Sequence, residues 1–251
     1  MNNSPQVLVL AGQRAGVADP LCEAFNVTYK VETQLIGKPM IKWVAEALDA
    51  AELKRPFIVS GYPALSEGWS IAASGDGPAD SALLALKDAS FPCLMTTGDH
   101  PLLTADILRF FIEASQKTGA DFCVGLADEQ TIQSAYPETK RTYLRFSDTA
   151  VSGCNLFYIA NSQGLAALEF WREAQHLRKK PLQLARKVGI GLGIRYAAGR
   201  LSISQAFDEA GKKIGIKASP VLLPYAEAAI DVDKVSDHDV VEKILLSRFN
   251  S

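Results

Sequence analysis

The most informative stretch of this chain is residues 7–30, VLVLAGQRAGVADPLCEAFNVTYK. The first four, residues 7–10, form a short apolar run of the kind found in fully buried strands. The run ends in Ala11-Gly12, and the loop that follows carries Arg14 and then Lys30. Small residues let backbone N–H groups approach a ligand closely, and the two cations add fixed positive charge. The stretch therefore predicts a buried strand followed by a loop that can hold a polyphosphate, without a Walker motif.

The composition is that of a globular protein without a nucleic-acid partner. Of the 251 residues, 48% are hydrophobic, enough for a substantial core, and the net charge of −2 argues against a basic binding face. No run approaches the roughly 18 apolar residues that span a bilayer, and the start of the chain lacks a signal-peptide pattern. The four cysteines have no C-x-x-C spacing, which favours separate thiols in a reducing compartment. We therefore expect a soluble, cytoplasmic protein with no membrane span.

Apolar runs alternate with helix-like segments in the first half of the chain. We expect strands at residues 7–10, 57–60, 91–97 and 121–126, and helices at 39–53, 81–88 and 104–118. Thr104 and Gly119 have the residue types that cap the two ends of the last of these helices. This alternation predicts right-handed βαβ units and an α/β fold with a mostly parallel sheet. The loops after residues 10, 60 and 97 should then share the rim where such sheets bind ligands.

The pattern changes from about residue 138. Residues 140–146 alternate as a strand does, residues 155–159 form a buried strand, and residues 162–192 read as a long helical region with a basic cluster. An apolar run at 214–221 precedes a closing helix at 236–248, with Ser236 as its N-cap. Because no repeat or linker interrupts the chain, residues 1–251 are expected to form a single domain. A lid or acceptor-binding insertion at about 138–220 is compatible with it.

Two acidic motifs have the chemistry of a metal site. Asp99 follows an apolar strand, where a carboxylate can bind Mg²⁺ that bridges phosphate oxygens, although an ordinary Asp-x-Pro turn explains it as well. Asp231 and Asp233 alternate in an extended segment and should share one face, with Val232 in the core. The alternative is that Asp233 only caps the last helix. His100, next to Asp99, is expected beside the site and not as a ligand.

Three further groups are polar and lie where a substrate could bind. Lys30 can stabilise charge at an α-phosphate, although a solvated surface lysine is the default interpretation. The loop from Gly75 to Ser81 can contact a base or ribose, or Ser81 can simply cap a helix. Polar side chains that bracket two strands can bind a phosphorylated acceptor, or be solvated charges at a sheet edge: Lys140, Arg141 and Asn155.

These pieces, in this order, resemble the GT-A-type nucleotidyltransferases of the MobA-like NTP transferase superfamily. That group includes molybdenum-cofactor guanylyltransferases and methylerythritol-phosphate cytidylyltransferases. The matching motifs are Leu10-Ala11-Gly12 with Arg14, Lys30 before Gly37-Lys38-Pro39-Met40, the loop from Gly75 to Ser81, Gly98-Asp99-His100-Pro101-Leu102, and Val232-Asp233-Lys234. The resemblance spans nearly the whole chain.

The resemblance implies a Rossmann-like three-layer α/β/α fold and transfer of NMP, with pyrophosphate release, from an NTP to a phosphorylated small-molecule acceptor. It implies Mg²⁺ or Mn²⁺ as cofactor, mildly favours CTP, and leaves a homo-oligomer open. The implied roles are catalysis by Lys30, Arg14 and Asp99, nucleotide binding by Leu10, Ala11, Gly12, Arg14, Lys30, Gly75, Ser81 and Gly98, acceptor binding by Lys140, Arg141 and Asn155, and metal binding by Asp99, Asp233 and Asp231.

Two other classes of function stay open at this point. A GT-A glycosyltransferase would use a nucleotide-sugar, but it usually carries D-x-D where this chain has Gly98-Asp99-His100-Pro101. A nucleotide-binding protein without turnover is the second alternative. It is favoured by the irregular loop at residues 13–19 and disfavoured by the joint presence of Lys30, Asp99 and Asp233.

Overall fold

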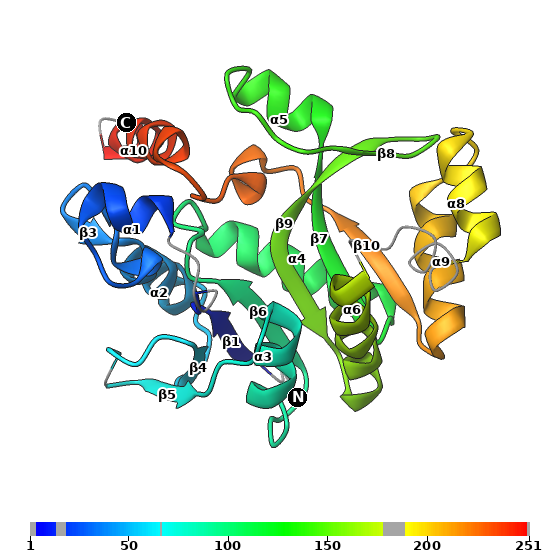
Figure 1. Ribbon diagram of the computed structural model, residues 1–251, viewed down its shortest axis with the longest axis horizontal. Helices are drawn as coiled ribbons and strands as arrows, with labels where there is room; N and C mark the ends of the chain where they lie inside the picture. The colour runs from blue at the N-terminus through cyan, green and yellow to red at the C-terminus, as the bar shows by residue number, and fades with distance from the viewer. Residues whose placement is uncertain (1–3, 14–18, 66, 178–188, 250–251) are drawn as a thin grey trace.

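The computed structural model describes residues 4–13, 19–65, 67–177 and 189–249, and within them strands form one large sheet (Figure 1). Its strands are β1 (Gln6–Leu10), β4 (Phe57–Ser60), β5 (Trp69–Ala72), β6 (Cys93–Thr97), β7 (Phe122–Asp128), β8 (Leu144–Arg145), β9 (Ala150–Ile159) and β10 (Ala218–Leu222). The pair β2 (Gln34–Leu35) and β3 (Lys38–Pro39) forms a separate small hairpin.

The sheet is mostly parallel, as the sequence predicts. Its order is β10-β7-β9-β6-β1-β4-β5, and β8 pairs with β9. β9 runs antiparallel to both β6 and β7, while the pairs β1–β4, β1–β6, β4–β5 and β7–β10 are parallel. The prediction that the loops after β1, β4 and β6 share one rim is confirmed, because these three strands are parallel neighbours.

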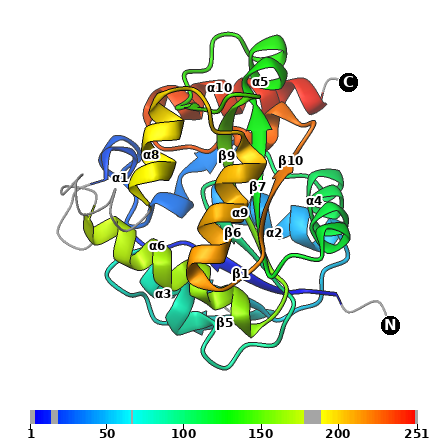
Figure 2. The ribbon, with the colours of Figure 1, turned by 90° about the vertical axis from the view of Figure 1, so that its right-hand side faces the viewer.

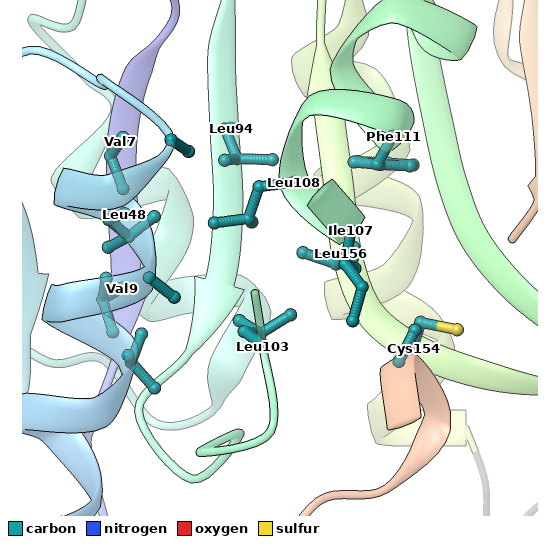
Figure 3. Packing of buried hydrophobic residues seen from close by; sticks show 14 of the residues in the cluster. Val7, Val9, Leu48, Leu94, Leu103, Ile107, Leu108, Phe111, Cys154 and Leu156 are labelled. Atoms are coloured by element: carbon teal, nitrogen blue, oxygen red, sulfur yellow. The ribbon is translucent and has the colours of Figure 1, made fainter. Parts of the chain in front are cut away.

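Helices cover both faces of the sheet and make three layers (Figure 2). On one face lie α2 (Met40–Ala50) and α4 (Ala105–Thr118), and on the other lie α3 (Pro78–Ala85) and α6 (Leu165–Leu177). Val7 and Val9 of β1 point toward the first pair, packing with Leu48 and Leu94 (Figure 3). Leu8 lies in the cluster on the opposite face. Because both faces are buried, residues 7–10 of β1 carry no polar side chain, which explains the unbroken apolar run after Gln6.

Of the three helices predicted in the first half of the chain, one has the predicted ends and two do not. The Thr104 hydroxyl accepts a hydrogen bond from Ile107 N at 3.3 Å, and Gly119 has φ +61°, so α4 ends as predicted. α2 ends at Ala50, three residues earlier than expected. α3 begins at Pro78, since proline is favoured in the first turn, and this places Ser81 inside the helix and not at its cap.

The second half of the chain departs further from the predictions. Alternation at 140–146 yields only the two-residue β8. Residues 178–188, which hold the whole basic cluster, lie outside the described residues. The predicted helix at 162–192 is described as η2 (Ser162–Gly164), α6 and α8 (Ile190–Ala197). α10 (Val235–Phe249) begins one residue before Ser236, so this serine is not the N-cap that we predicted.

Several elements were not predicted. They are α1 (Pro20–Phe25), η1 (Lys30–Glu32), α5 (Glu129–Ala135), α9 (Ile203–Ile214), η3 (Ala226–Ala229) and the edge strand β5. α9 carries a capping box, in which Ser202 and Gln205 each accept a hydrogen bond from the other's backbone N–H. That spacing is visible in the sequence and could have found this helix.

Two expectations concern the whole chain: that it forms a single domain and that it has no membrane span. Strands from residue 6 to residue 222 share the large sheet, while the assignment of residues 1–251 to one domain with an insertion stays a prediction. Across the described ranges, no helix has both the length and the apolar composition needed to cross a membrane.

Candidate functional site

Two glycines at the carboxyl ends of β4 and β6 have no space for a Cβ unless their neighbours move. Gly61 has φ +84°, and a Cβ there would lie 2.4 Å from Gly12 Cα. A Cβ on Gly98 would lie 2.8 Å from Val31 Cγ1. Backbone hydrogen bonds join the same loops, from Ala11 N to Ser60 O at 2.9 Å and from Gly98 N to Leu10 O at 2.8 Å. The backbones of these loops are therefore closely packed, and the charged side chains of the site project from them.

Lys30 stands on this rim at the start of the short helix η1, whose geometry fixes the base of its side chain. Val31 is buried, and the Glu32 carboxylate accepts hydrogen bonds from Tyr29 N at 2.9 Å and Thr28 N at 3.2 Å. The Tyr62 hydroxyl donates to the other carboxylate oxygen of Glu32 at 3.2 Å. Because the turn is anchored from both sides, only the side chain of Lys30 is free to change direction.

Lys30 joins the two acidic motifs. Its ammonium nitrogen lies 2.5 Å from Asp99 Oδ2 and 2.6 Å from Asp233 Oδ1. The Lys30 and Asp99 side chains are 16% and 17% exposed, whereas Asp233 is 66% exposed, so the cluster opens toward solvent on the Asp233 side. Burial lowers the pKa of Lys30, but the two carboxylates outweigh it and hold the pKa above its usual value. The ammonium is therefore charged, and three sequence motifs meet at one atom.

The segment between β10 and α10 carries Asp233 to this place by crossing above the sheet toward β1 (Figure 1). Val232 is fully buried, and its N–H donates to Asp99 O at 3.0 Å. Asp233 N donates to Asp237 Oδ2 at 3.1 Å. The two loops that supply the carboxylates are thus tied by their backbones, and Asp237 does more than complement the dipole of α10.

Asp231 belongs to a second, adjacent cluster. Its Oδ1 accepts from Arg141 Nη2 at 2.6 Å, and its Oδ2 accepts from Asn155 Nδ2 at 2.7 Å. Burial raises the pKa of Asp231, but the Arg141 guanidinium outweighs it and keeps the pKa below its usual value. The alternation of Asp231 and Asp233 predicted that they share one face. In the structure they have different partners. Each aspartate instead faces a different cation, and the segment that carries both is not part of a strand.

The geometry of β9 explains how Asn155 reaches Asp231. The pairing of β7 with β9 shifts register between Val124 and Leu126, and Asn155 lies in the bulge with φ +50°. A bulge re-aims the side chains that it contains. The structure thus brings together Arg141 and Asn155, two of the three residues predicted to bind the acceptor. The third, Lys140, is exposed.

His100 lies beneath the site and is only 1% exposed. Its Nε2 lies 3.3 Å from Glu227 O, and within the described part of the chain its Nδ1 has no hydrogen-bond partner. Burial lowers the pKa of His100, although the carboxylates of Asp231 and Asp99 oppose this effect. The ring is therefore a neutral support between the two acidic loops, behind the predicted ligands.

The predicted nucleotide-binding residues differ in what they offer. Ser81 Oγ accepts a hydrogen bond from Gly75 N at 2.9 Å, so its hydroxyl holds the loop that precedes α3. Leu10 is part of the core and the N–H of Ala11 is engaged in the sheet, so these two residues position the loop while Gly12 begins it. Arg14, predicted to be catalytic, lies outside the described residues.

The carboxylate oxygens that surround Lys30 are ligands of the kind that a hard divalent cation takes. Asp99 and Asp233 supply carboxylate oxygens, and Asp99 Oδ1 is buried with no hydrogen-bond partner among the described atoms. Among those residues, no group of three or more His, Cys, Asp or Glu side chains is arranged to hold a metal by itself. Mg²⁺ usually takes one or two carboxylates and completes its shell with water and substrate phosphates, so Asp99 and Asp233 are the residues that could hold it.

Two supporting residues were missed by the sequence analysis. Glu32 follows Tyr29 by three residues, which is capping-box spacing, and it anchors the turn under Lys30. Asp237 lies in the first turn of α10, and its contact with Asp233 N holds the second acidic motif in place. Both contacts join residues at most four positions apart, so their spacing in the sequence could have predicted them.

Known proteins similar to this chain share its fold. A model of the MobA-like NTP transferase domain matches residues 8–186. A hypothetical transferase from Thermus thermophilus is 31% identical, with a TM-score of 0.82 over 93% of this chain and 99% of that one. Molybdopterin-guanine dinucleotide biosynthesis protein A from Archaeoglobus fulgidus is 15% identical, with a TM-score of 0.53 over 96% and 99%. A 2-C-methyl-D-erythritol 4-phosphate cytidylyltransferase, also from Thermus thermophilus, is 14% identical, with a TM-score of 0.52 over 96% and 98%.

One curated relative matches a shorter stretch. The bifunctional protein GlmU of Caldanaerobacter subterraneus subsp. tengcongensis is 30% identical over 105 residues. The match spans 38% of this chain and 23% of that protein's length.

Proposed function

Because this chain belongs to the MobA-like NTP transferase family, we propose that it moves NMP from an NTP to a phosphorylated small-molecule acceptor and releases pyrophosphate. The observation that carries the proposal is the meeting of Lys30, Asp99 and Asp233 at one nitrogen atom. A cation at the foot of a rigid loop, flanked by two carboxylates, is an arrangement suited to phosphoryl chemistry.

In the proposed reaction an oxygen of the acceptor phosphate attacks the α-phosphorus of the NTP in line. The new P–O bond forms as the bond between the α-phosphorus and the α,β-bridging oxygen breaks, and pyrophosphate leaves with that electron pair. The attacking phosphate is already ionised, so it needs no strong general base. Positioning and charge stabilisation then provide most of the rate enhancement.

Lys30 would neutralise the charge that builds up on the α-phosphate, and Arg14 with the loop after Gly12 would hold the outer phosphates. Mg²⁺ or Mn²⁺ on Asp99 and Asp233 would supply further positive charge to the phosphates. Removing one preorganised charge of this kind costs roughly 10²–10³ in kcat.

The cluster around Asp231 is proposed as the acceptor side. Of the Arg141 nitrogens, Nη2 is the one whose hydrogen bond to Asp231 is described, and a guanidinium has five N–H donors in all. Arg141 and Asn155, oriented by Asp231, can therefore present donors to an acceptor phosphate. Asp231 then acts as a positioning residue in this proposal, in place of the metal ligand expected from the sequence.

Ligand-induced stabilisation is the first test of the proposal. Thermal unfolding is measured with CTP, GTP, ATP and UTP in the presence of Mg²⁺, with CTP the favoured ligand. A nucleotide at 100 times its Kd stabilises by about 2.7 kcal/mol. For a chain of this length, that corresponds to a shift of roughly 5–11 °C. No shift with any of the four would contradict the proposal.

Turnover is the second test. Pyrophosphate release is followed with the stabilising NTP and a panel of sugar 1-phosphates and polyol phosphates. Lys30→Ala and Asp99→Ala should reduce turnover by about 10²–10³, whereas Asp106→Ala, whose side chain is 79% exposed on α4, should not. Stabilisation by nucleotide-sugars alone would favour the glycosyltransferase alternative. Stabilisation by an NTP without turnover on the panel would favour a nucleotide-binding protein.

A further inference from the structure

The place that a divalent metal needs is already occupied by a positive charge. Lys30 Nζ contacts Asp99 Oδ2 at 2.5 Å and Asp233 Oδ1 at 2.6 Å. Both contacts are charge-assisted hydrogen bonds, and they come from the two carboxylates that fit a metal. The ammonium thus pairs with one oxygen of each carboxylate, while Asp99 Oδ1 has no partner among the described atoms.

A metal ion and the ammonium compete for the same carboxylates. Their like charges repel at short range, most strongly where the site is partly shielded from water. Asp99 and Lys30 are 17% and 16% exposed, so screening by solvent is incomplete. A metal bound by Asp99 and Asp233 therefore disfavours the present position of Lys30.

The backbone of Lys30 is held by its neighbours, so we expect the side chain to be the part that moves. η1 is held by buried Val31 and by the hydrogen bonds of Glu32 to Tyr29 N and Thr28 N. The side chain alone must swing away, and a largely buried ammonium then needs another anion, because leaving it unpaired is costly. A triphosphate provides that anion beside the same loop.

We propose that Lys30 is a built-in competitor of the divalent metal, which keeps the metal site closed until a nucleotide phosphate draws the ammonium away. This inference rests on the proposed function, of which it describes the regulation. Its consequence is that metal and nucleotide bind together, and the free protein binds metal weakly. One side chain then has two roles, as the partner of the carboxylates before substrate binds and as the partner of the phosphate afterwards.

Metal binding to the free protein tests this directly. Mn²⁺ is titrated into the full chain without nucleotide, and the signal of free Mn²⁺ is followed by electron paramagnetic resonance. Lys30→Met removes the charge and keeps an unbranched side chain, and Lys30→Arg keeps the charge. The matched control is Lys38→Met, which removes a lysine that pairs with Glu46 on the surface.

Lys30→Met should bind Mn²⁺ about tenfold more tightly than the wild type, because the metal no longer has to displace the ammonium and the binding-competent state is more populated. Lys30→Arg and Lys38→Met should bind as weakly as the wild type. Lys30→Gln is the second neutral variant if Lys30→Met does not fold, and unfolding midpoints are recorded for all variants. Equal Mn²⁺ affinity in the wild type and the neutral variant would overturn the inference.

A second arm separates this outcome from failure of the proposed function. The stabilisation of the wild type by CTP, GTP, ATP and UTP is measured with and without Mn²⁺. If no nucleotide stabilises the protein in a Mn²⁺-dependent way, the inference is overturned together with the metal-dependent reaction. If stabilisation is seen but neutral variants gain no Mn²⁺ affinity, the inference alone is wrong.

Discussion

The ion pair between Arg141 and Asp231 makes a quantitative prediction about stability. In Asp231→Asn the side chain keeps its shape but loses its charge, so Arg141 is left with no carboxylate at 2.6 Å. The new amide also places a donor where Asp231 Oδ2 accepted from Asn155. The variant therefore leaves a cation without its partner in a poorly solvated place.

The expected cost follows from the burial of the pair. Removing one partner of a fully buried ion pair costs about 3–5 kcal/mol. The Arg141 and Asp231 side chains are 15% and 13% exposed, so water still screens part of the interaction. We therefore expect a loss of about 2–4 kcal/mol, since partial exposure lowers the value of a charge pair. For a chain of this length the unfolding midpoint falls by about 4–16 °C.

The assay is thermal unfolding, with an exposed ion pair as the control. Glu129→Gln breaks the pair of Glu129 with Arg145, whose side chains are 33% and 66% exposed. That variant should unfold at the wild-type temperature. The double variant Arg141→Met with Asp231→Asn removes both charges and should recover part of the loss, because no cation is then left unpaired.

The reasoning would be refuted if Asp231→Asn unfolded at the same temperature as Glu129→Gln. It would also be refuted if the double variant were as unstable as the sum of its two single variants, because the two charges would then not interact.

Two further variants test the local structure around the site. Gly98→Ala should lower both turnover and the unfolding midpoint, because its Cβ would lie 2.8 Å from Val31 Cγ1 and push on the turn that carries Lys30; overpacking of this kind costs about 1–3 kcal/mol. Unchanged pyrophosphate release and stability would show that the loops at the site are not closely packed. Thr104→Ala should cost about 1 kcal/mol, or roughly 2–4 °C, through loss of the cap of α4, with turnover unchanged. An unaltered unfolding midpoint would mean that the hydrogen bond to Ile107 N contributes nothing.

The layered architecture could be predicted from the sequence alone. The unbroken apolar run of β1 and its alternation with amphipathic segments predict a parallel sheet covered on both faces, because only such a strand has no solvent side. The rim also followed from the sequence, since parallel strands have their carboxyl ends at one edge. The caps of α4 at Thr104 and Gly119 were also predictable, because a helix cap depends on residues within a few positions of it.

The pairing of the charged residues, in contrast, depends on contacts between distant parts of the chain. Lys30 and Asp233 lie 203 positions apart in the chain, and no local pattern shows that they meet. Alternation predicted that Asp231 and Asp233 share one face, but the structure pairs Asp231 with Arg141 and Asp233 with Lys30. Periodicity reports which face of one element is buried. The partner of a charge depends on where distant elements are brought together, and that is determined by the packing of the whole sheet.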